Sequence, residues 1–139
     1  MNEIREGGCL CGSVRYRTIG APVAATVCHC KFCQRRSGSA FGEGILFRLE
    51  QVEFSGGPLA VYEHRSDESG RWLRLEFCPK CGTTVTWTGE RRPGMRVIAG
   101  GTFDDPGWLR PARHIWTRSA QPWIPIPSGV ECFEKGAPS

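Results

Sequence analysis

Cysteines are the residues whose number and spacing point most clearly to chemistry in this chain of 139 residues. Seven of the eight fall into two pairs and one triplet, and the eighth stands alone: Cys9 and Cys11, Cys78 and Cys81, then Cys28, Cys30 and Cys33, and finally Cys132. Close groups of thiols are typical of metal sites in reducing compartments and of disulfides in secreted proteins. The charged N-terminal segment has no apolar run, so we expect no signal peptide and a cytoplasmic protein that binds metal.

The two cysteine pairs suit a structural zinc ion. Structural zinc sites have four ligands in a tetrahedron, and all four are commonly cysteines. A glycine follows each pair and allows a tight turn in which backbone N–H groups approach sulfur. We therefore expect Cys9, Cys11, Cys78 and Cys81 to form one closed site. That site would connect the first part of the chain to a later hairpin, which closes a long loop.

The triplet Cys28, Cys30 and Cys33 supplies only three ligands, which is the pattern of a catalytic zinc ion with one open position. Spacing alone leaves open a second grouping, in which a zinc ribbon forms from Cys30, Cys33, Cys78 and Cys81, and Cys9, Cys11 and Cys28 remain. We expect His29, between two of the triplet cysteines, to point away from the metal and to pack or hydrogen-bond. We expect Cys132 to be a free thiol.

A zinc ion held by three thiolates favours carbon–sulfur chemistry. Its site carries a net negative charge before a fourth ligand arrives, so it polarises carbonyl groups poorly. A soft exogenous thiol is the better partner. The bound thiol would lose its proton and remain nucleophilic, because the whole centre is anionic. We therefore expect thiol addition or its reversal in preference to hydrolysis.

Basic and hydroxyl side chains next to the triplet are candidates for contacts with such a thiol substrate. Lys31, Arg35 and Arg36 could bind carboxylates, and arginine can do so with two hydrogen bonds. Alternatively, these charges are solvated and offset the anionic zinc site. Ser37 could donate a hydrogen bond near the metal or belong to an ordinary turn. The segment Gly89–Gly94 contains two arginines and reads as a solvated turn, with a basic binding loop as the alternative.

The net charge does not indicate a nucleic-acid-binding protein once metal is considered. The formal charge is +4. Seven thiolates and two zinc ions would reduce this to about +1, because the thiolates outweigh the metal charge. We expect no nucleic-acid partner. We also expect no membrane partner, because no apolar run reaches the roughly 18 residues that a spanning helix needs.

The elements that must position these cysteines are short strands. The chain contains 18 Gly and 10 Pro, and runs of β-branched and aromatic residues recur between turn signals. The expected strands are Ser13–Arg17, Gly44–Leu49, Val52–Phe54, Leu59–His64, Trp72–Phe77, Thr83–Thr88, Met95–Gly100 and His114–Trp116. A helical turn is expected in Lys31–Ser39. We expect a mainly β fold in one domain spanning residues 1–139, with a core at 7–123 and a proline-rich surface tail at 124–139, for which Trp123 and Ile126 would be anchors.

Several motifs occur in an order that resembles a known family. They are Gly8-Cys9-x-Cys11-Gly12, Cys28-His29-Cys30-x-x-Cys33, Ser37-Gly38-Ser39, Phe77-Cys78-x-x-Cys81-Gly82-Thr83 and Gly101-Thr102-Phe103-Asp104-Asp105-Pro106. The sequence resembles the glutathione-dependent formaldehyde-activating enzyme family, to which centromere protein V is related. The resemblance implies a β-tent fold of short antiparallel sheets. It also implies a structural zinc ion on the two cysteine pairs and a catalytic one on the triplet.

The family's reaction agrees with the chemistry expected of the triplet. The resemblance implies a carbon–sulfur lyase that adds glutathione, as its co-substrate, to formaldehyde and cleaves the S-hydroxymethylglutathione adduct. Two other functions fit the same cysteines: a non-catalytic carrier of thiols with an open zinc ion, and an interaction module in which zinc is purely structural.

Overall fold

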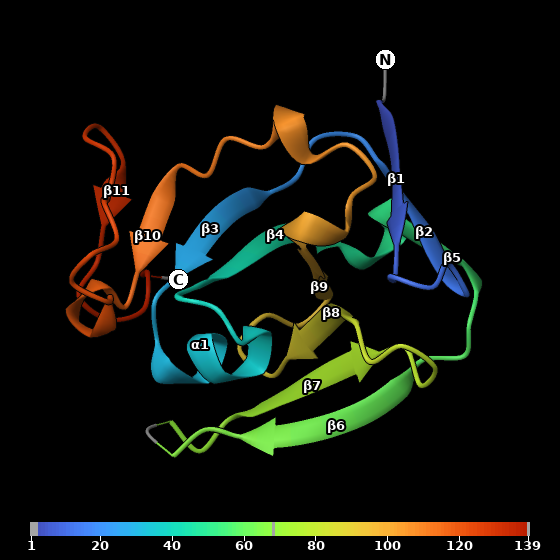
Figure 1. Ribbon diagram of the computed structural model, residues 1–139, viewed down its shortest axis with the longest axis horizontal. Helices are drawn as coiled ribbons and strands as arrows, with labels where there is room; N and C mark the ends of the chain where they lie inside the picture. Colours follow the sequence, from blue (N-terminus) through green and yellow to red (C-terminus); the bar gives the residue numbers. More distant parts are fainter. Residues whose placement is uncertain (1–2, 68, 139) are drawn as a thin grey trace.

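The protein is mainly β in the computed structural model, which describes residues 3–67 and 69–138 (Figure 1). Eleven strands are described: β1 (Ile4–Gly8), β2 (Val14–Ile19), β3 (Ala24–Cys28), β4 (Gly42–Arg48), β5 (Val52–Gly56), β6 (Ala60–Arg65), β7 (Trp72–Phe77), β8 (Thr84–Gly89), β9 (Met95–Ala99), β10 (Arg113–Ile115) and β11 (Glu131–Cys132). The described α-helix is α1 (Lys31–Ser37), and four short 3-10 turns complete the elements. In the described part of the chain, no helix combines the length and apolarity needed to cross a membrane.

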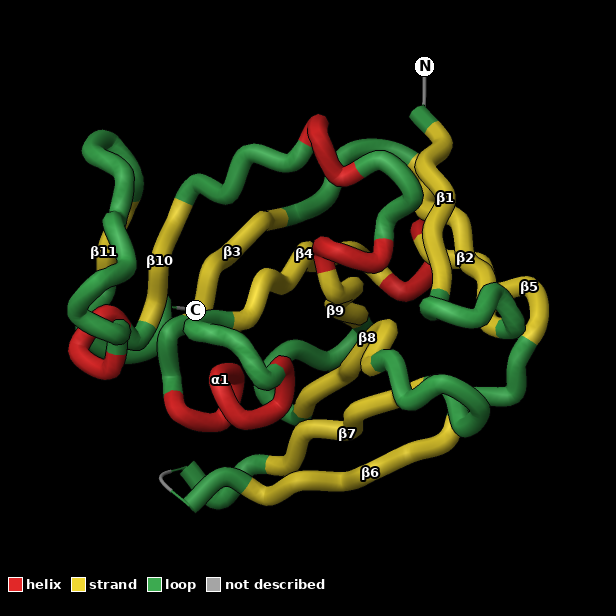
Figure 2. The backbone as a smooth tube through the Cα atoms, in the orientation of Figure 1, coloured by secondary structure: helices red, strands yellow, loops and turns green. Residues whose placement is uncertain are grey.

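The strands form two sheets. The smaller sheet has the order β1-β2-β5 and is antiparallel throughout. The larger sheet has eight strands in the order β11-β10-β3-β4-β9-β8-β7-β6. It sweeps around α1 from β11 to β6, with the smaller sheet on the other side of its centre (Figures 1 and 2). The expectation of antiparallel sheets holds except at β10, which runs parallel to both β3 and β11.

The hydrophobic core lies between the two sheets. Tyr16 of β2 packs edge-on against Phe103 with ring centroids 5.5 Å apart, and Phe47 of β4 lies on the other side of Phe103. Ile45 and Ile98, paired across β4 and β9, are fully buried in the same cluster. Burial of these large side chains supplies the main stabilising term of a domain this small.

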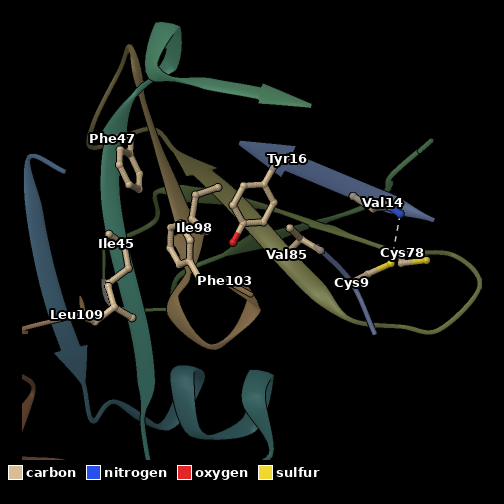
Figure 3. Close-up of a cluster of buried hydrophobic side chains, with 10 residues drawn as sticks. All are labelled: Cys9, Val14, Tyr16, Ile45, Phe47, Cys78, Val85, Ile98, Phe103 and Leu109. Atoms are coloured by element: carbon tan, nitrogen blue, oxygen red, sulfur yellow. Dashed lines mark hydrogen bonds between the residues drawn. The ribbon is translucent and has the colours of Figure 1, made fainter. Parts of the chain in front are cut away.

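Two cysteines are part of this core. Cys9 and Cys78 are buried at its edge, where the turns after β1 and β7 approach each other (Figure 3). The cluster of four cysteines is therefore continuous with the packing between the sheets. Metal bound there would fix the edge of the core.

Trp123 does not anchor the C-terminal tail, contrary to the expectation. Its side chain is 71% exposed, and its indole donates a hydrogen bond to Gln121. The tail is held by Gln121, whose amide bonds to the side chain of Gln34 in α1, and by the parallel strand β11. Proline spacing indicated a surface segment but carried no information about which side chain packs.

Candidate metal centres and ligand cavity

The structure brings together the four cysteines of the two pairs. Cys9 and Cys11 lie in the turn between β1 and β2, and Cys78 and Cys81 lie in the turn between β7 and β8. All four Sγ atoms lie within 4.8 Å of one another. The grouping of Cys30 and Cys33 with the β7–β8 turn, which spacing left open, does not occur among the described residues.

The geometry of the four-cysteine cluster fits a tetrahedral zinc ion. Zn–S bonds of about 2.3 Å place the sulfurs of a tetrahedron about 3.8 Å apart. The Sγ atom of Cys11 lies 3.7 Å from those of both Cys9 and Cys78. All eight cysteines of the chain are free thiols, so no disulfide competes for these sulfurs.

Neighbouring donors favour the thiolate form in this cluster. The backbone N–H of Val14 lies 3.2 Å from the Cys9 sulfur, and the Ser13 hydroxyl lies 3.3 Å from the sulfurs of Cys11 and Cys78. The hydrogen bond from the Thr83 hydroxyl, 3.2 Å from the Cys81 sulfur, is the main reason why the pKa of Cys81 falls to about 5. Hydrogen bonds to a charged form stabilise it, so these donors prepare the sulfurs to bind a cation.

The triplet forms a second, separate cluster where β3 meets α1. Cys28 ends β3, Cys30 is the N-cap of α1, and Cys33 lies in the first turn of that helix. Their three Sγ atoms lie within 4.8 Å of one another, and those of Cys28 and Cys30 are 3.4 Å apart. The backbone N–H of Cys33 donates to the Cys30 sulfur at 3.3 Å. The three sulfurs converge because the end of β3 is followed directly by the N-cap and first turn of α1.

The protons of the triplet are distributed unevenly. Hydrogen bonds from Cys28 and Cys33 lower the pKa of the Cys30 thiol to about 3. The hydrogen bonds that Cys28 makes with Cys30 and Cys33 raise the pKa of the Cys28 thiol far above its usual value. Three thiolates this close repel one another, so without a cation only some of them can be ionised. A divalent ion would supply the missing positive charge, and the donor set suits zinc.

The triplet opens into a cavity of about 310 Å³ on the concave side of the larger sheet. Gly42 and Gly44 of β4 line it, together with residues of β7, β8 and β9. Trp87 and Trp116 also line it. Trp116 has φ of 55°, the left-handed region that a bulky residue rarely adopts, and this backbone conformation occurs at the cavity wall.

Of the four side chains predicted to bind the thiol substrate, one lies in this cavity. Arg36 lines it and stacks on Trp87 with 4.2 Å between the guanidinium carbon and the ring centroid. Lys31 is exposed and borders a neighbouring cavity of about 510 Å³. Arg35 is exposed and lines none of the described cavities. The Ser37 hydroxyl donates to the carbonyl of Cys33 at 2.7 Å, which stabilises the helix end and does not reach the sulfurs.

Sequence reasoning missed most of the positive charge in the cavity. Arg91 and Arg92, in the turn after β8, and Arg113 of β10 line the cavity together with the three sulfurs. The signal was present in Gly89–Gly94, which contains two adjacent arginines, but that segment reads equally well as a solvated turn. Arg113 could be found only from the parallel pairing of β10 with β3, the strand that carries Cys28.

Comparison with known proteins agrees with this geometry. Residues 4–119 match the family model described as glutathione-dependent formaldehyde-activating enzyme, which covers most of the chain. This chain belongs to the glutathione-dependent formaldehyde-activating enzyme family. It is similar to a Halomonas elongata protein named "Putative glutathione-dependent formaldehyde-activating enzyme", with 24% identity over 92% of this chain and 85% of that one.

A solved structure has the same fold. The crystal structure of a Rhodobacter sphaeroides protein matches with a TM-score of 0.57 at 20% identity, over 76% of this chain and 91% of the other. This member of the glutathione-dependent formaldehyde-activating enzyme family therefore shares most of its fold with a distant protein.

A buried pair of histidines supports the triplet in this family member. His29 and His114 are both buried, and His29 Nε2 lies 2.8 Å from His114 Nδ1. Burial lowers the pKa of both imidazoles, so the pair is held in its neutral form. The backbone N–H of His29 also donates to the carbonyl of Ile115. The expectation that His29 hydrogen-bonds instead of approaching the metal agrees with this arrangement, which fastens the Cys28–Cys30 segment to β10.

Proposed function

We propose that this protein is a zinc-dependent carbon–sulfur lyase acting on adducts of glutathione with formaldehyde, in a reducing cytoplasmic setting. One observation carries the proposal: the sulfurs of Cys28, Cys30 and Cys33 converge at the wall of a cavity. The other cluster has four sulfurs and is continuous with the core. Three ligands beside an open space are typical of a catalytic site, and four closed ligands are typical of a structural one.

A zinc ion on the triplet would take an exogenous thiol as its fourth ligand and lower the pKa of that thiol. In the forward reaction a carbon–sulfur bond forms, the carbonyl π bond breaks, and the thiol proton ends on the new hydroxyl group. The reverse reaction breaks the carbon–sulfur bond and releases formaldehyde and the thiol. The described residues that line the cavity include cations but no carboxylate, which suits an anionic thiol such as glutathione.

Residues of the chain contribute by positioning. Arg36 lies against Trp87, and the Nε atom of Arg36 is buried without a hydrogen-bond partner in the described part of the chain. A buried donor without a partner is costly, and an anionic ligand in the cavity would satisfy it. The histidine pair keeps the Cys28–Cys30 segment in place, so the sulfurs converge before the thiol arrives.

The test is the exchange of glutathione and ¹³C-formaldehyde with their hydroxymethyl adduct, followed by NMR against the uncatalysed rate. The zinc-loaded protein should accelerate both directions equally. Cys30→Ala should return the rate to the background, whereas Cys132→Ala, at an exposed free cysteine outside both clusters, should leave it unchanged. Background rates with the zinc-loaded wild-type protein would contradict the lyase function. Glutathione binding without acceleration would favour a carrier.

A further inference from the structure

The wall of the cavity opposite α1 carries a concentration of positive charge that the proposed reaction does not by itself require. Arg91 and Arg92 come from the turn between β8 and β9, and Arg113 comes from β10. These segments are far apart in the sequence, and the larger sheet curves between them (Figure 1). Their arginines line one cavity. Among residues 3–67 and 69–138, none of those that line this cavity is an aspartate or glutamate.

Several arginines elsewhere in the chain are paired with a carboxylate. Arg15 pairs with Asp104, Arg17 with Glu53 at 2.6 Å, and Arg96 with Glu76 at 2.8 Å. No comparable ion pair is described for the three cavity arginines within residues 3–67 and 69–138. These three arginines line one concave site together with Arg36, and such a concentration of guanidinium groups favours the binding of an anion there.

The arrangement is partly fixed before any ligand binds. The guanidinium of Arg91 donates a hydrogen bond to the backbone carbonyl of Ala137 in the tail. Burial, together with the charges of Arg91 and Arg113, lowers the pKa of Arg92. Neighbouring like charges raise the free energy of the empty cavity, and a carboxylate would remove part of that cost. Arginine suits this task because its planar guanidinium binds both oxygens of a carboxylate.

We propose that Arg91, Arg92 and Arg113 form an anion site that binds the glycyl carboxylate of a glutathione-type thiol whose sulfur lies at the triplet. This inference rests on the proposed function and identifies the end of the thiol that the cavity recognises. The γ-glutamyl end of glutathione carries an ammonium group beside its carboxylate. Several arginines line the cavity, and no aspartate or glutamate does so in the described part of the chain, so the cavity repels that ammonium. The glycyl end carries only negative charge.

The test compares S-methylglutathione with its glycyl monoethyl ester, using calorimetric binding to the zinc-loaded protein. Methylation removes the thiol proton, so binding of these probes does not depend on turnover. The wild-type protein should bind the free acid about 10- to 100-fold more tightly than the ester, the range expected of hydrogen bonds to a charged group. Arg92→Gln and Arg113→Gln should each remove most of this preference and leave ester binding unchanged.

Arg17→Gln is the matched control, because Arg17 is exposed on the smaller sheet and lines no described cavity. It makes the same change in net charge and should keep the preference for the acid. Circular dichroism and zinc content verify that each variant is folded. Equal affinity for acid and ester in the wild-type protein would overturn the proposal. A preference that survives both cavity substitutions would overturn it too.

The binding comparison and the exchange assay test the anion site and the lyase function separately. A protein that accelerates adduct exchange but binds acid and ester equally lacks the anion site, and its lyase function stands. A protein that prefers the acid through Arg92 and Arg113 but gives only the background exchange rate has the anion site, and its lyase function fails.

Discussion

Individual cysteines of this protein have different physical tasks, which follow from their surroundings. Cys78 is fully buried in the core and faces three other sulfurs. Cys33 lies on a short helix beside a cavity. The four-cysteine cluster connects turns that are far apart in the sequence, so metal there removes much more chain entropy than metal on the triplet. Loss of a sulfur should therefore lower the free energy of unfolding more in the four-cysteine cluster than in the triplet.

We expect Cys78→Ala to reduce the free energy of unfolding by at least about 3 kcal/mol, because it removes a ligand of the core zinc site. Cys33→Ala should cost about 1 kcal/mol, because the triplet closes only a short loop and alanine is favourable in a helix. Urea denaturation combined with zinc analysis measures both, and Cys33→Ala should retain one zinc ion per chain. Equal destabilisation by the two substitutions would be inconsistent with different roles for the clusters.

The histidine pair gives a second prediction at the residue scale. His114→Ala leaves the Nε2 atom of His29 buried without its partner. His29 Nδ1 already has no partner among the described residues, so the whole imidazole would be unsatisfied. A buried polar group that loses its hydrogen bond costs about 1–3 kcal/mol. Thermal unfolding should show this loss, and the acceleration of adduct exchange should fall as the Cys28–Cys30 segment loosens. Unchanged stability and rate would show that the pair has no positioning role.

At the scale of elements, sequence patterns predicted most of the larger sheet and missed strands without apolar alternation. Trp72–Phe77 is reproduced as β7, and the other expected strands agree with β2, β4, β5, β6, β8, β9 and β10 to within a few residues. The expected helical turn agrees with α1. The missed strands are β1, which contains charges and two glycines, β3, which is rich in alanine, and the two-residue β11.

These misses have a common physical reason. Strands β1, β3 and β11 are defined by what they pair with, and local sequence does not carry that information. The cysteine clusters were predictable because the spacing of thiols in the sequence by itself indicates a metal site. The arginine site was not, because it depends on how β10 pairs with β3 and on how the turn after β8 folds back over the cavity.

Strand β1 illustrates how close packing selects glycine. A Cβ atom at Gly7 would overlap both the Thr102 carbonyl oxygen and the Tyr16 hydroxyl. We expect Gly7→Ala to cost about 2–3 kcal/mol, because backbone and a buried ring must move. Gly101→Ala is the matched control, since a Cβ there meets nothing within 4 Å. Chemical denaturation of both variants tests this, and comparable stabilities would refute the packing argument.

At the scale of the whole molecule, the proposed function assigns stability to one cluster and chemistry to the other. One closes the edge of the core between the sheets, and the other borders the ligand cavity under α1. A mild chelator should therefore remove one zinc ion first and abolish adduct exchange, while circular dichroism remains unchanged. Removal of the second ion should require harsher treatment and should unfold the domain. Zinc release followed by a colorimetric indicator, alongside the spectrum, tests this order; simultaneous release with unfolding would contradict it.

The proposed function requires that the triplet hold an open zinc ion that accepts the sulfur of an exogenous thiol. Anomalous diffraction at the zinc edge, from crystals soaked with glutathione, tests it most directly. We expect two zinc peaks in the anomalous map. One lies within the four-cysteine cluster, and the other is bound by Cys28, Cys30 and Cys33 with the glutathione sulfur as the fourth ligand. A single peak, or a triplet site closed by a protein side chain, would contradict it.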